Sequence, residues 1–438
     1  MIASMRDLDA KQSGARGRRA LRLGACMALV AAIALVPTAA SADGVRDQQY
    51  WLDAYGIRAA WTVTEGSGVT IAIIDTGVDG SVRDLSGAVI GGADFSGLGT
   101  PNGQRPVGAE GSEHGTMVAS LAVGRGTGPG SGVIGSAPAA SILAISIGFD
   151  EGDVSSDDQI AQAVRFAVDN GANIINMSLT RNTLEWPESW DDAFLYAMEN
   201  DVVVVAAAGN RGSGTTVVGA PATMPGVLTV AGVDSTGEAS FDASSQGITI
   251  AVSAPSEGLV GVVPGGGYVR WNGTSGATPI VAGVAALVMA SHPELDAANV
   301  INRIVATARD AGTSGPDPIY GFGLIDAYAA VTATVSPVTA NPMGELSEWI
   351  TLYRRADAEP EPISSPPAAT IPTPSPAPIA VQPQNPLGSI LPTVNLLRNV
   401  GLPLGVVALF AGAVVWLGVS LFGRLRVARA TASRRASP

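Results

Sequence analysis

The feature that most constrains this chain is the segment of residues 280–290, which is apolar almost all the way round a helix. A helix without a polar face must be buried, so the chain has to build a domain that encloses it. Gly273 and Gly276 bracket Thr274 and Ser275 just before this segment, and glycine lets another chain approach the backbone closely. The free N–H groups and the dipole of a helix start favour negative charge, so Ser275 is a candidate nucleophile. The alternative is that Thr274 or Ser275 only caps the helix.

A serine hydroxyl is a weak nucleophile at neutral pH and needs a general base beside it. The chain contains two histidines, His114 and His292. His292 is followed by Pro293 where the buried helix ends, which is typical of a solvated residue at a helix end. We therefore predict that His114 is the base.

A histidine base needs a carboxylate that holds its tautomer and stabilises its cation. Asp75 is the best candidate, because it follows an apolar, β-branched run at residues 69–74. Such a run predicts a buried strand. The carboxylate then lies at the carboxyl end of that strand, which is the edge of a parallel sheet where active sites form.

The three motifs, in the order Asp75, His114 and Ser275, resemble the subtilisin-like serine proteases, in which the triad has this chain order. The resemblance extends from about residue 61 to about residue 330. It implies a three-layer subtilisin-like α/β fold, with a mostly parallel sheet between helices, and a serine endopeptidase that works through an acyl-enzyme.

Alternating strand and helix patterns independently predict a parallel sheet that helices cover on both faces. The predicted strands are residues 141–147, 174–179, 202–208 and 227–233, and the predicted helices are residues 157–170 and 190–200.

By resemblance, Asn210 is the oxyanion donor and works together with the backbone N–H of Ser275. A fixed donor of this kind lowers the barrier to acyl transfer by about 3 kcal/mol. The alternative is an asparagine that caps a turn.

The resemblance also places the substrate-binding residues. The backbone of Ser178 and Leu179 is expected to pair with an extended peptide as an added strand, and Ala208 and Gly209 complete that site. Thr180 stands where the family usually has glycine, so we expect a narrower primary pocket and name no preferred substrate residue.

Two further expectations concern the surroundings of the site. Gly276 stands where the family usually has methionine, and we expect looser packing under Ser275 without the loss of a catalytic group. The Met224–Pro225 bond is expected to be cis, by resemblance to an aromatic–proline bond near the primary pocket of the family.

Composition excludes several other classes of site. The only cysteine is Cys26, so no intramolecular disulfide can form. No residues have convincing metal-ligand spacing, and we predict neither a metal site nor a cofactor, although family members often bind calcium. Of the formal net charge of −13, residues 1–42 hold +4 and residues 423–438 hold +5, so residues 43–422 hold −22. Such an acidic body argues against nucleic acid as a partner.

The N-terminal part of the chain predicts export. Residues 1–42 have a basic end, an apolar stretch and an Ala-Ser-Ala cleavage site, which together predict a signal peptide. Residues 43–335 are the predicted subtilisin-like peptidase domain with an N-terminal arm. Only residues 43–74 precede Asp75 after cleavage, which leaves no room for a folding pro-domain.

The C-terminal part predicts a membrane anchor. Residues 336–400 are a predicted Pro-rich linker, with a short packed segment at residues 346–350. Residues 401–422 are uncharged and long enough to form a transmembrane helix, which needs about 20 residues. The five arginines of residues 423–438 predict a cytoplasmic tail.

The arm at residues 48–57, the anchor and the topology resemble the mycosins, the membrane-anchored subtilisin-like proteases of actinobacterial type VII secretion. The resemblance implies a single-pass protein of the cell membrane with an extracytoplasmic catalytic domain, a protein or peptide substrate and a type VII secretion membrane complex as partner. Mycosins usually carry disulfides, and this chain differs from them because its single cysteine cannot form one within the chain. Two alternatives are a structural subunit that stabilises a secretion complex, with proteolysis secondary, and a general cell-surface protease.

Overall fold

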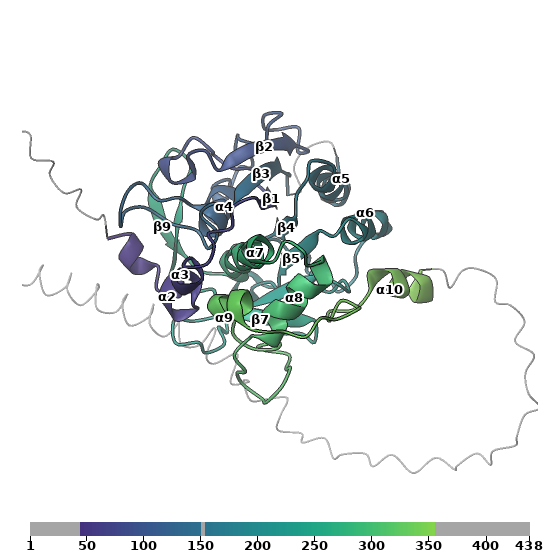
Figure 1. The fold of residues 1–438 in the computed structure, drawn as a ribbon. Helices are drawn as coiled ribbons and strands as arrows, with labels where there is room; N and C mark the ends of the chain where they lie inside the picture. The colour runs from purple at the N-terminus through teal and green to yellow at the C-terminus, as the bar shows by residue number, and fades with distance from the viewer. Residues whose placement is uncertain (1–43, 150–153, 355–438) are drawn as a thin grey trace, which may run out of the picture. The chain divides into compact units, whose positions relative to one another are not determined.

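A seven-stranded parallel sheet forms the centre of the computed structural model, which describes residues 44–149 and 154–354 (Figure 1). The strands lie in the order β2-β3-β1-β4-β5-β6-β7, and each strand is parallel to its neighbours. Their bounds are Thr70–Asp75 (β1), Val89–Asp94 (β2), Ser141–Ser146 (β3), Ile174–Met177 (β4), Val203–Ala207 (β5), Leu228–Val233 (β6) and Ile250–Pro255 (β7). β2 and β3 lie on one side of β1, and β4 to β7 lie on the other. The strand order thus reverses beside β1, and such a switch point opens a crevice at the strands' carboxyl ends.

Helices cover both faces of the sheet (Figure 1). One face carries α5 and α6, and the other carries α4, α7, α8 and α9 together with the short α2 and α3. The bounds are Trp51–Ala54 (α2), Ile57–Ala60 (α3), His114–Val123 (α4), Ser156–Asp169 (α5), Glu188–Glu199 (α6), Thr274–Ser291 (α7), Ala297–Ala306 (α8), Ala327–Thr332 (α9) and Leu346–Tyr353 (α10). Short 3₁₀ turns lie at Arg46–Gln48, Arg83–Leu85 and Arg211–Ser213, and a two-stranded antiparallel hairpin comprises β8 (Leu259–Val262) and β9 (Tyr268–Trp271).

The side chains of β1 show why the sheet is covered twice. Successive side chains of a strand point to opposite faces. Ile71 and Ile73 accordingly belong to the core under α4 and α7, whereas Ala72 and Ile74 belong to the core under α5 and α6. The predicted three-layer α/β fold is therefore confirmed. The predicted elements are also present. β3, β4 and β5 end one or two residues earlier than expected, because the chain turns into loops at the carboxyl edge, whereas β6 ends at residue 233 as predicted.

Helix α7 occupies the middle of one layer, in contact with β4, β5, β6 and β7 and with α4. Nearly all of its side chains are buried, as its apolar sequence predicts. Among the described residues, α7 is also the one helix that is long and apolar enough to cross a bilayer, and here it is the core helix of the domain. The predicted signal peptide, the predicted transmembrane helix at residues 401–422 and the predicted tail lie outside the described residues.

The structure corrects the predicted end of the domain at residue 335, because residues 336–354 pack on the domain. Asn299 donates from its side chain to Val338 O and accepts a hydrogen bond from the N–H of Val338. Arg354, at the end of α10, donates to the Asp191 carboxylate at 2.9 Å. The short packed segment that we predicted at residues 346–350 is thus part of a longer ordered extension.

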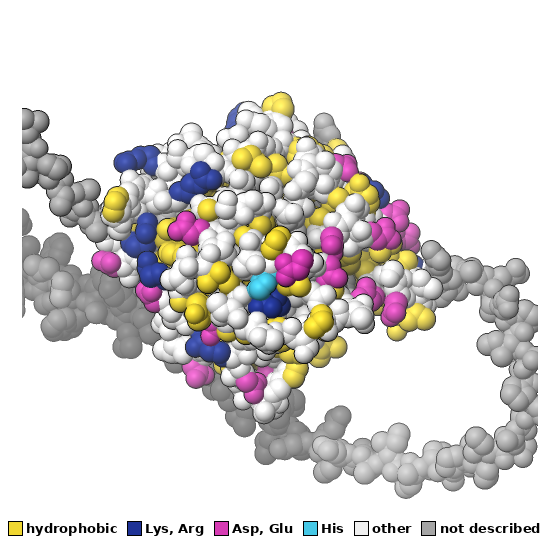
Figure 2. All heavy atoms as spheres, in the orientation of Figure 1, with side chains coloured by type: hydrophobic (Ala, Val, Ile, Leu, Met, Phe, Trp, Pro, Cys, Tyr) yellow, Lys and Arg dark blue, Asp and Glu magenta, His cyan; other side chains and the backbone are white. Residues whose placement is uncertain are grey.

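On the side of the sheet covered by α7, α8 and α9, the molecular surface carries both acidic and basic side chains (Figure 2). The two signs lie scattered among polar and apolar atoms, and the described chain gathers no broad basic patch on this face. Such a surface lacks the stripe of positive charge with which proteins bind nucleic acid.

The N-terminal arm is held by partly buried polar contacts with the loop between α4 and β3. Gln49, which is 2% exposed, donates to Ile134 O at 2.8 Å and accepts from the Ile134 N–H at 3.0 Å. Arg46 donates to the carbonyl oxygens of Ser131 and Gly132. These contacts join the arm to the loop that follows the helix carrying His114.

We therefore predict that Gln49→Ala lowers the free energy of unfolding by about 1–3 kcal/mol, because it leaves the partly buried N–H and C=O of Ile134 without the Gln49 side chain as partner. Urea denaturation of the purified protein measures the effect. Gln48→Ala, one residue earlier and exposed, is the matched control and should change stability little. Equal effects of the two substitutions would contradict this account of the arm.

Candidate active site

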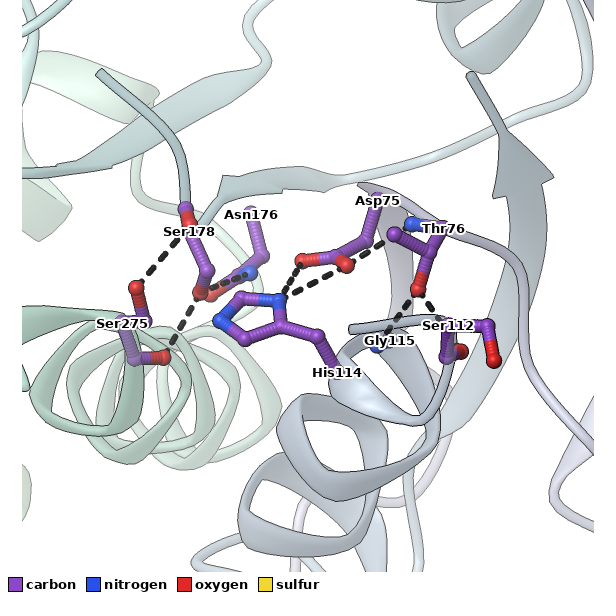
Figure 3. A network of polar contacts seen from close by, with 8 residues as sticks. All are labelled: Asp75, Thr76, Ser112, His114, Gly115, Asn176, Ser178 and Ser275. Carbon is purple, nitrogen blue, oxygen red and sulfur yellow. Dashed lines mark hydrogen bonds and ion pairs between the residues drawn. The ribbon is translucent and has the colours of Figure 1, made fainter. Parts of the chain in front are cut away.

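Asp75 and His114 form a hydrogen-bonded pair at the carboxyl end of β1 (Figure 3). His114 Nδ1 lies 2.8 Å from Asp75 Oδ1 and 3.0 Å from Oδ2. Asp75 is fully buried, and the imidazole of His114 is 26% exposed. A buried carboxylate on Nδ1 fixes the tautomer whose Nε2 can accept a proton. In Figure 3 the other ring nitrogen points away from Asp75, toward Ser275.

Two neighbouring residues hold α4 against β1 and so fix the distance between the pair. Thr76 Oγ1 donates to Ser112 O and accepts from the Gly115 N–H, both at 3.0 Å. A side chain at Gly115 would overlap Gly77 O and press on Asp75, so glycine is required beside His114.

Ser275 is the second residue of α7, as its place before the buried helix predicts. Its hydroxyl donates to Ser178 O at 3.1 Å, so it has to rotate to reach the imidazole of His114. The first N–H groups of a helix have no partner one turn earlier in the helix. Here the Thr274 N–H donates to Asn210 Oδ1 and the Gly276 N–H donates to Gly273 O.

Asn210 lies after β5 and is held by the start of α7. Its Oδ1 accepts from the backbone N–H of Thr274 at 2.8 Å and from the Thr274 hydroxyl at 3.0 Å. The carboxamide oxygen is thus occupied, and within the described residues Nδ2 has no acceptor. The amide therefore offers its N–H groups to the space beside Ser275, as an oxyanion donor must.

These groups open on one cavity of about 330 Å³. Its lining comprises Thr76, Glu110, Gly111, His114, Phe149, Ser178, Leu179, Thr180, Ala207, Gly209, Asn210, Thr274 and Ser275. Most of the residues that we predicted for the site lie in this lining. The exceptions are Asp75, which is buried behind His114, and Ala208, whose side chain is buried in the core, although its neighbours Ala207 and Gly209 line the cavity.

Several lining residues were not predicted from the sequence. Thr76 and Thr274 each adjoin a predicted residue, and that position next to a strand end or helix start was the available signal. Glu110 lies four residues before His114 in a polar loop, and nothing local marks it. Phe149 reaches the cavity only because β3 lies beside β1.

The pKa of His114 is raised above its ordinary value. Burial opposes protonation of the imidazole and by itself lowers the pKa, but the charge and hydrogen bond of Asp75 outweigh it, and the charge of Glu113 adds to them. The imidazolium that forms when a serine gives up its proton is therefore stabilised here.

The packing under Ser275 differs from the expectation for Gly276. A Cβ at Gly276 would overlap Leu259 Cδ1 and lie 3.3 Å from the ring of Trp271. Leu259 and Trp271 therefore fill the space that a longer side chain would take, and the predicted loosening is wrong. Trp271 also packs edge-on against the His114 ring, with the ring centroids 5.6 Å apart.

The expected cis bond at Met224–Pro225 is also wrong. The cis peptide bond lies at Ala220–Pro221, four residues earlier. There the chain is held against the segment after Leu179, since the Arg181 N–H donates to Ala220 O at 2.7 Å.

Thr180 stands between two cavities. It lines both the site cavity and a neighbouring cavity of about 560 Å³, which also shares Phe149 and Leu179. Its hydroxyl donates to Arg181 O at 3.1 Å. The side chain that replaces the expected glycine therefore forms part of the wall between them.

His292 lies at the opposite end of α7 from Ser275. It follows the last residue of the helix, and its Nε2 is 2.7 Å from Val331 O. It is partly buried there rather than solvated as expected, but it is far from the site. Within the described ranges, no group of three or more His, Cys, Asp and Glu residues could hold a metal ion.

Comparisons with known proteins agree with this geometry. The model of the subtilase family (Peptidase S8) matches residues 66–323. Subtilisin E of Bacillus subtilis (strain 168) is 39% identical over 268 residues, which cover 60% of this chain and 66% of subtilisin E, slightly less than two thirds of its length.

Two solved structures are similar over most of their length. MycP1 from Mycobacterium smegmatis has 31% sequence identity and a TM-score of 0.57, and the alignment covers 68% of this chain and 88% of that chain. MycP3, a protease from the type VII (ESX-3) secretion system, has 31% identity and a TM-score of 0.56, with 65% and 88% covered.

The pKa of His114 leads to a prediction for Glu113→Gln. Loss of this charge disfavours the imidazolium, so the pKa of His114 falls and the acidic limb of the pH profile of kcat/KM moves to lower pH. Glu199→Gln is the control, because α6 ends at the opposite edge of the sheet. A limb that stays in place, or moves to higher pH, would contradict the role of Glu113.

The packing at Gly276 leads to a second prediction. Gly276→Met overpacks the contact with Leu259 and Trp271 and should lower the free energy of unfolding by about 1–3 kcal/mol. In the Gly276→Met/Leu259→Ala double variant the new side chain fills the vacated space, so its destabilisation should be less than the sum of the two single effects. Denaturation of the four proteins measures the coupling, and strictly additive effects would rule out the contact.

Proposed function

Because the chain belongs to the subtilase family, we propose that it is a serine endopeptidase in which Asp75, His114 and Ser275 form the catalytic triad. The observation that carries the proposal is the buried Asp75–His114 pair, which opens on the same cavity as Ser275 and Asn210. A nucleophile, a base, a residue that orients the base and an oxyanion donor are the parts that acyl transfer needs.

The proposed reaction begins when the Ser275 hydroxyl leaves Ser178 O and turns to His114. Its oxygen attacks the carbonyl carbon of the peptide while Nε2 of His114 takes the proton. Asp75 stabilises the imidazolium that results, in keeping with the raised pKa of His114. Asn210 Nδ2 and the Ser275 N–H hold the negative charge on the carbonyl oxygen.

The intermediate then collapses. His114 gives its proton to the leaving amine, the C–N bond breaks, and an ester joins the substrate acyl group to Ser275. Water, deprotonated by His114, attacks this ester, and the proton returns to Ser275 as the acid leaves.

The substrate is a protein or peptide in extended form. Ser178, Leu179 and Thr180 follow the end of β4 and line the cavity, so their backbone can take an added strand. Gly209, on the other side of the cavity, has a φ of +97° and packs against Thr215, which leaves no room for a side chain there.

We further propose that the protein is a mycosin that works in type VII secretion. Its likeness to MycP1 and MycP3 and the docked N-terminal arm support this assignment. The predicted signal peptide, the predicted transmembrane segment at residues 401–422 and the arginines after it support a single-pass protein whose catalytic domain is extracytoplasmic and whose C-terminus is cytoplasmic.

The triad is tested with His114→Ala and Ser275→Ala. Either change should lower kcat for peptide hydrolysis by about 10⁶-fold, the size of the loss that the corresponding changes cause in subtilisin. Turnover of a peptide and labelling of Ser275 by a fluorophosphonate are the readouts, with folding checked by circular dichroism. His292→Ala, which removes the other histidine, is the control and should keep normal turnover. Normal turnover in His114→Ala would refute the proposed triad.

A further inference from the structure

The nucleophile-bearing turn of α7 lacks one backbone hydrogen bond. In an α-helix the C=O of residue 275 accepts from the N–H of residue 279. Residue 279 is Pro279, which lies inside α7 and has no N–H. A proline ring at this position also pushes away the carbonyl one turn earlier. Ser275 O therefore lacks its regular donor within the helix.

The hydroxyl of Ser178 supplies the missing donor. Ser178 Oγ donates to Ser275 O at 2.8 Å, across 97 residues of sequence (Figure 3). Ser178 is 4% exposed, so water does not readily replace its hydroxyl in this role.

Asn176 sets the direction of that hydrogen bond. Its Nδ2 donates to Ser178 Oγ at 3.0 Å, and Asn176 is fully buried. A hydroxyl has one proton to donate. Because Ser178 Oγ accepts from Asn176, its own proton is committed to Ser275 O, and Asn176, Ser178 and Ser275 form one directed chain (Figure 3).

We propose that Ser178, oriented by Asn176, is a positioning residue that fixes the nucleophile by replacing the N–H that Pro279 lacks. The C=O to which Ser178 donates and the side chain of Ser275 are attached to the same Cα. A fixed C=O therefore fixes where the hydroxyl of Ser275 can lie relative to His114 and to the substrate-binding segment. This inference rests on the proposed function.

Misplacement of a reacting group by about 1 Å can cost about 100-fold in rate. Ser178→Ala removes the donor and leaves the substrate-pairing backbone of residues 178–180 in place. We expect kcat, and the rate at which a fluorophosphonate labels Ser275, to fall about 10–100-fold while KM stays within about threefold. Ser178→Thr keeps a hydroxyl and should retain most of the rate.

The decisive variant is Pro279→Ala, which gives residue 279 an N–H that can reach Ser275 O. In this background Ser178→Ala should cost much less in kcat than it does beside Pro279. A matched control is Ser291→Ala, since Ser291 also donates from its hydroxyl to carbonyl oxygens of α7, but at the far end of the helix. It should leave kcat unchanged in both backgrounds.

Three results would contradict the positioning role of Ser178. An equal loss of kcat from Ser178→Ala in both backgrounds, a loss that appears only in KM, or a loss that Ser178→Thr shares in full would overturn the inference. If Ser178→Ala alone does not fold, recovery of folding and turnover in the double variant supports the inference, and failure to recover contradicts it. A wild-type protein that neither turns over peptide nor reacts with the fluorophosphonate would instead refute the proposed function.

Discussion

The structure depends on the burial of α7. Because this helix has no polar face, the chain has to enclose it between the sheet and the helices around it, and this fixes the place of its first turn at the carboxyl edge of the sheet. The same edge receives Asp75 from β1 and Asn210 from the loop after β5. The hydrophobic effect thus helps to assemble the polar site, since a shift of α7 would expose apolar surface as well as change the hydrogen bonds that its first turn makes with Ser178 and Asn210.

Sequence patterns predicted those site residues that lie at the ends of helices and strands with a clear hydrophobic pattern. Asp75 ends a β-branched run, and Ser275 begins an apolar helix, so local periodicity marked both. His114 followed by elimination, because the other histidine lies beside a proline. Ala208 as a substrate-binding residue stays a prediction, because its two neighbours, Ala207 and Gly209, line the cavity while Ala208 itself is buried.

The errors arose where the answer depends on residues distant in sequence. Looser packing under Ser275 followed from Gly276 alone, but the space is filled by Leu259 from the β8–β9 hairpin, whose proximity no local pattern shows. The domain boundary at residue 335 followed from a change in composition. Composition does not show that Asn299 binds the chain at Val338, beyond that boundary.

The hydrogen bonds around Ser275 show how a proline inside a helix can free a backbone carbonyl for a contact outside the helix. Proline inside a helix normally costs stability, because one carbonyl loses its donor. Here the freed carbonyl lies beside the segment after β4, where Ser178 gives a hydroxyl to Ser275 O and offers its own carbonyl to the Ser275 hydroxyl. Two reciprocal hydrogen bonds thus join the proposed nucleophile, Ser275, to the segment that lines the proposed substrate cavity. A regular first turn would satisfy its carbonyl internally and would have no need of this partner, so Pro279 directs a backbone group of α7 toward the substrate-binding side of the cleft.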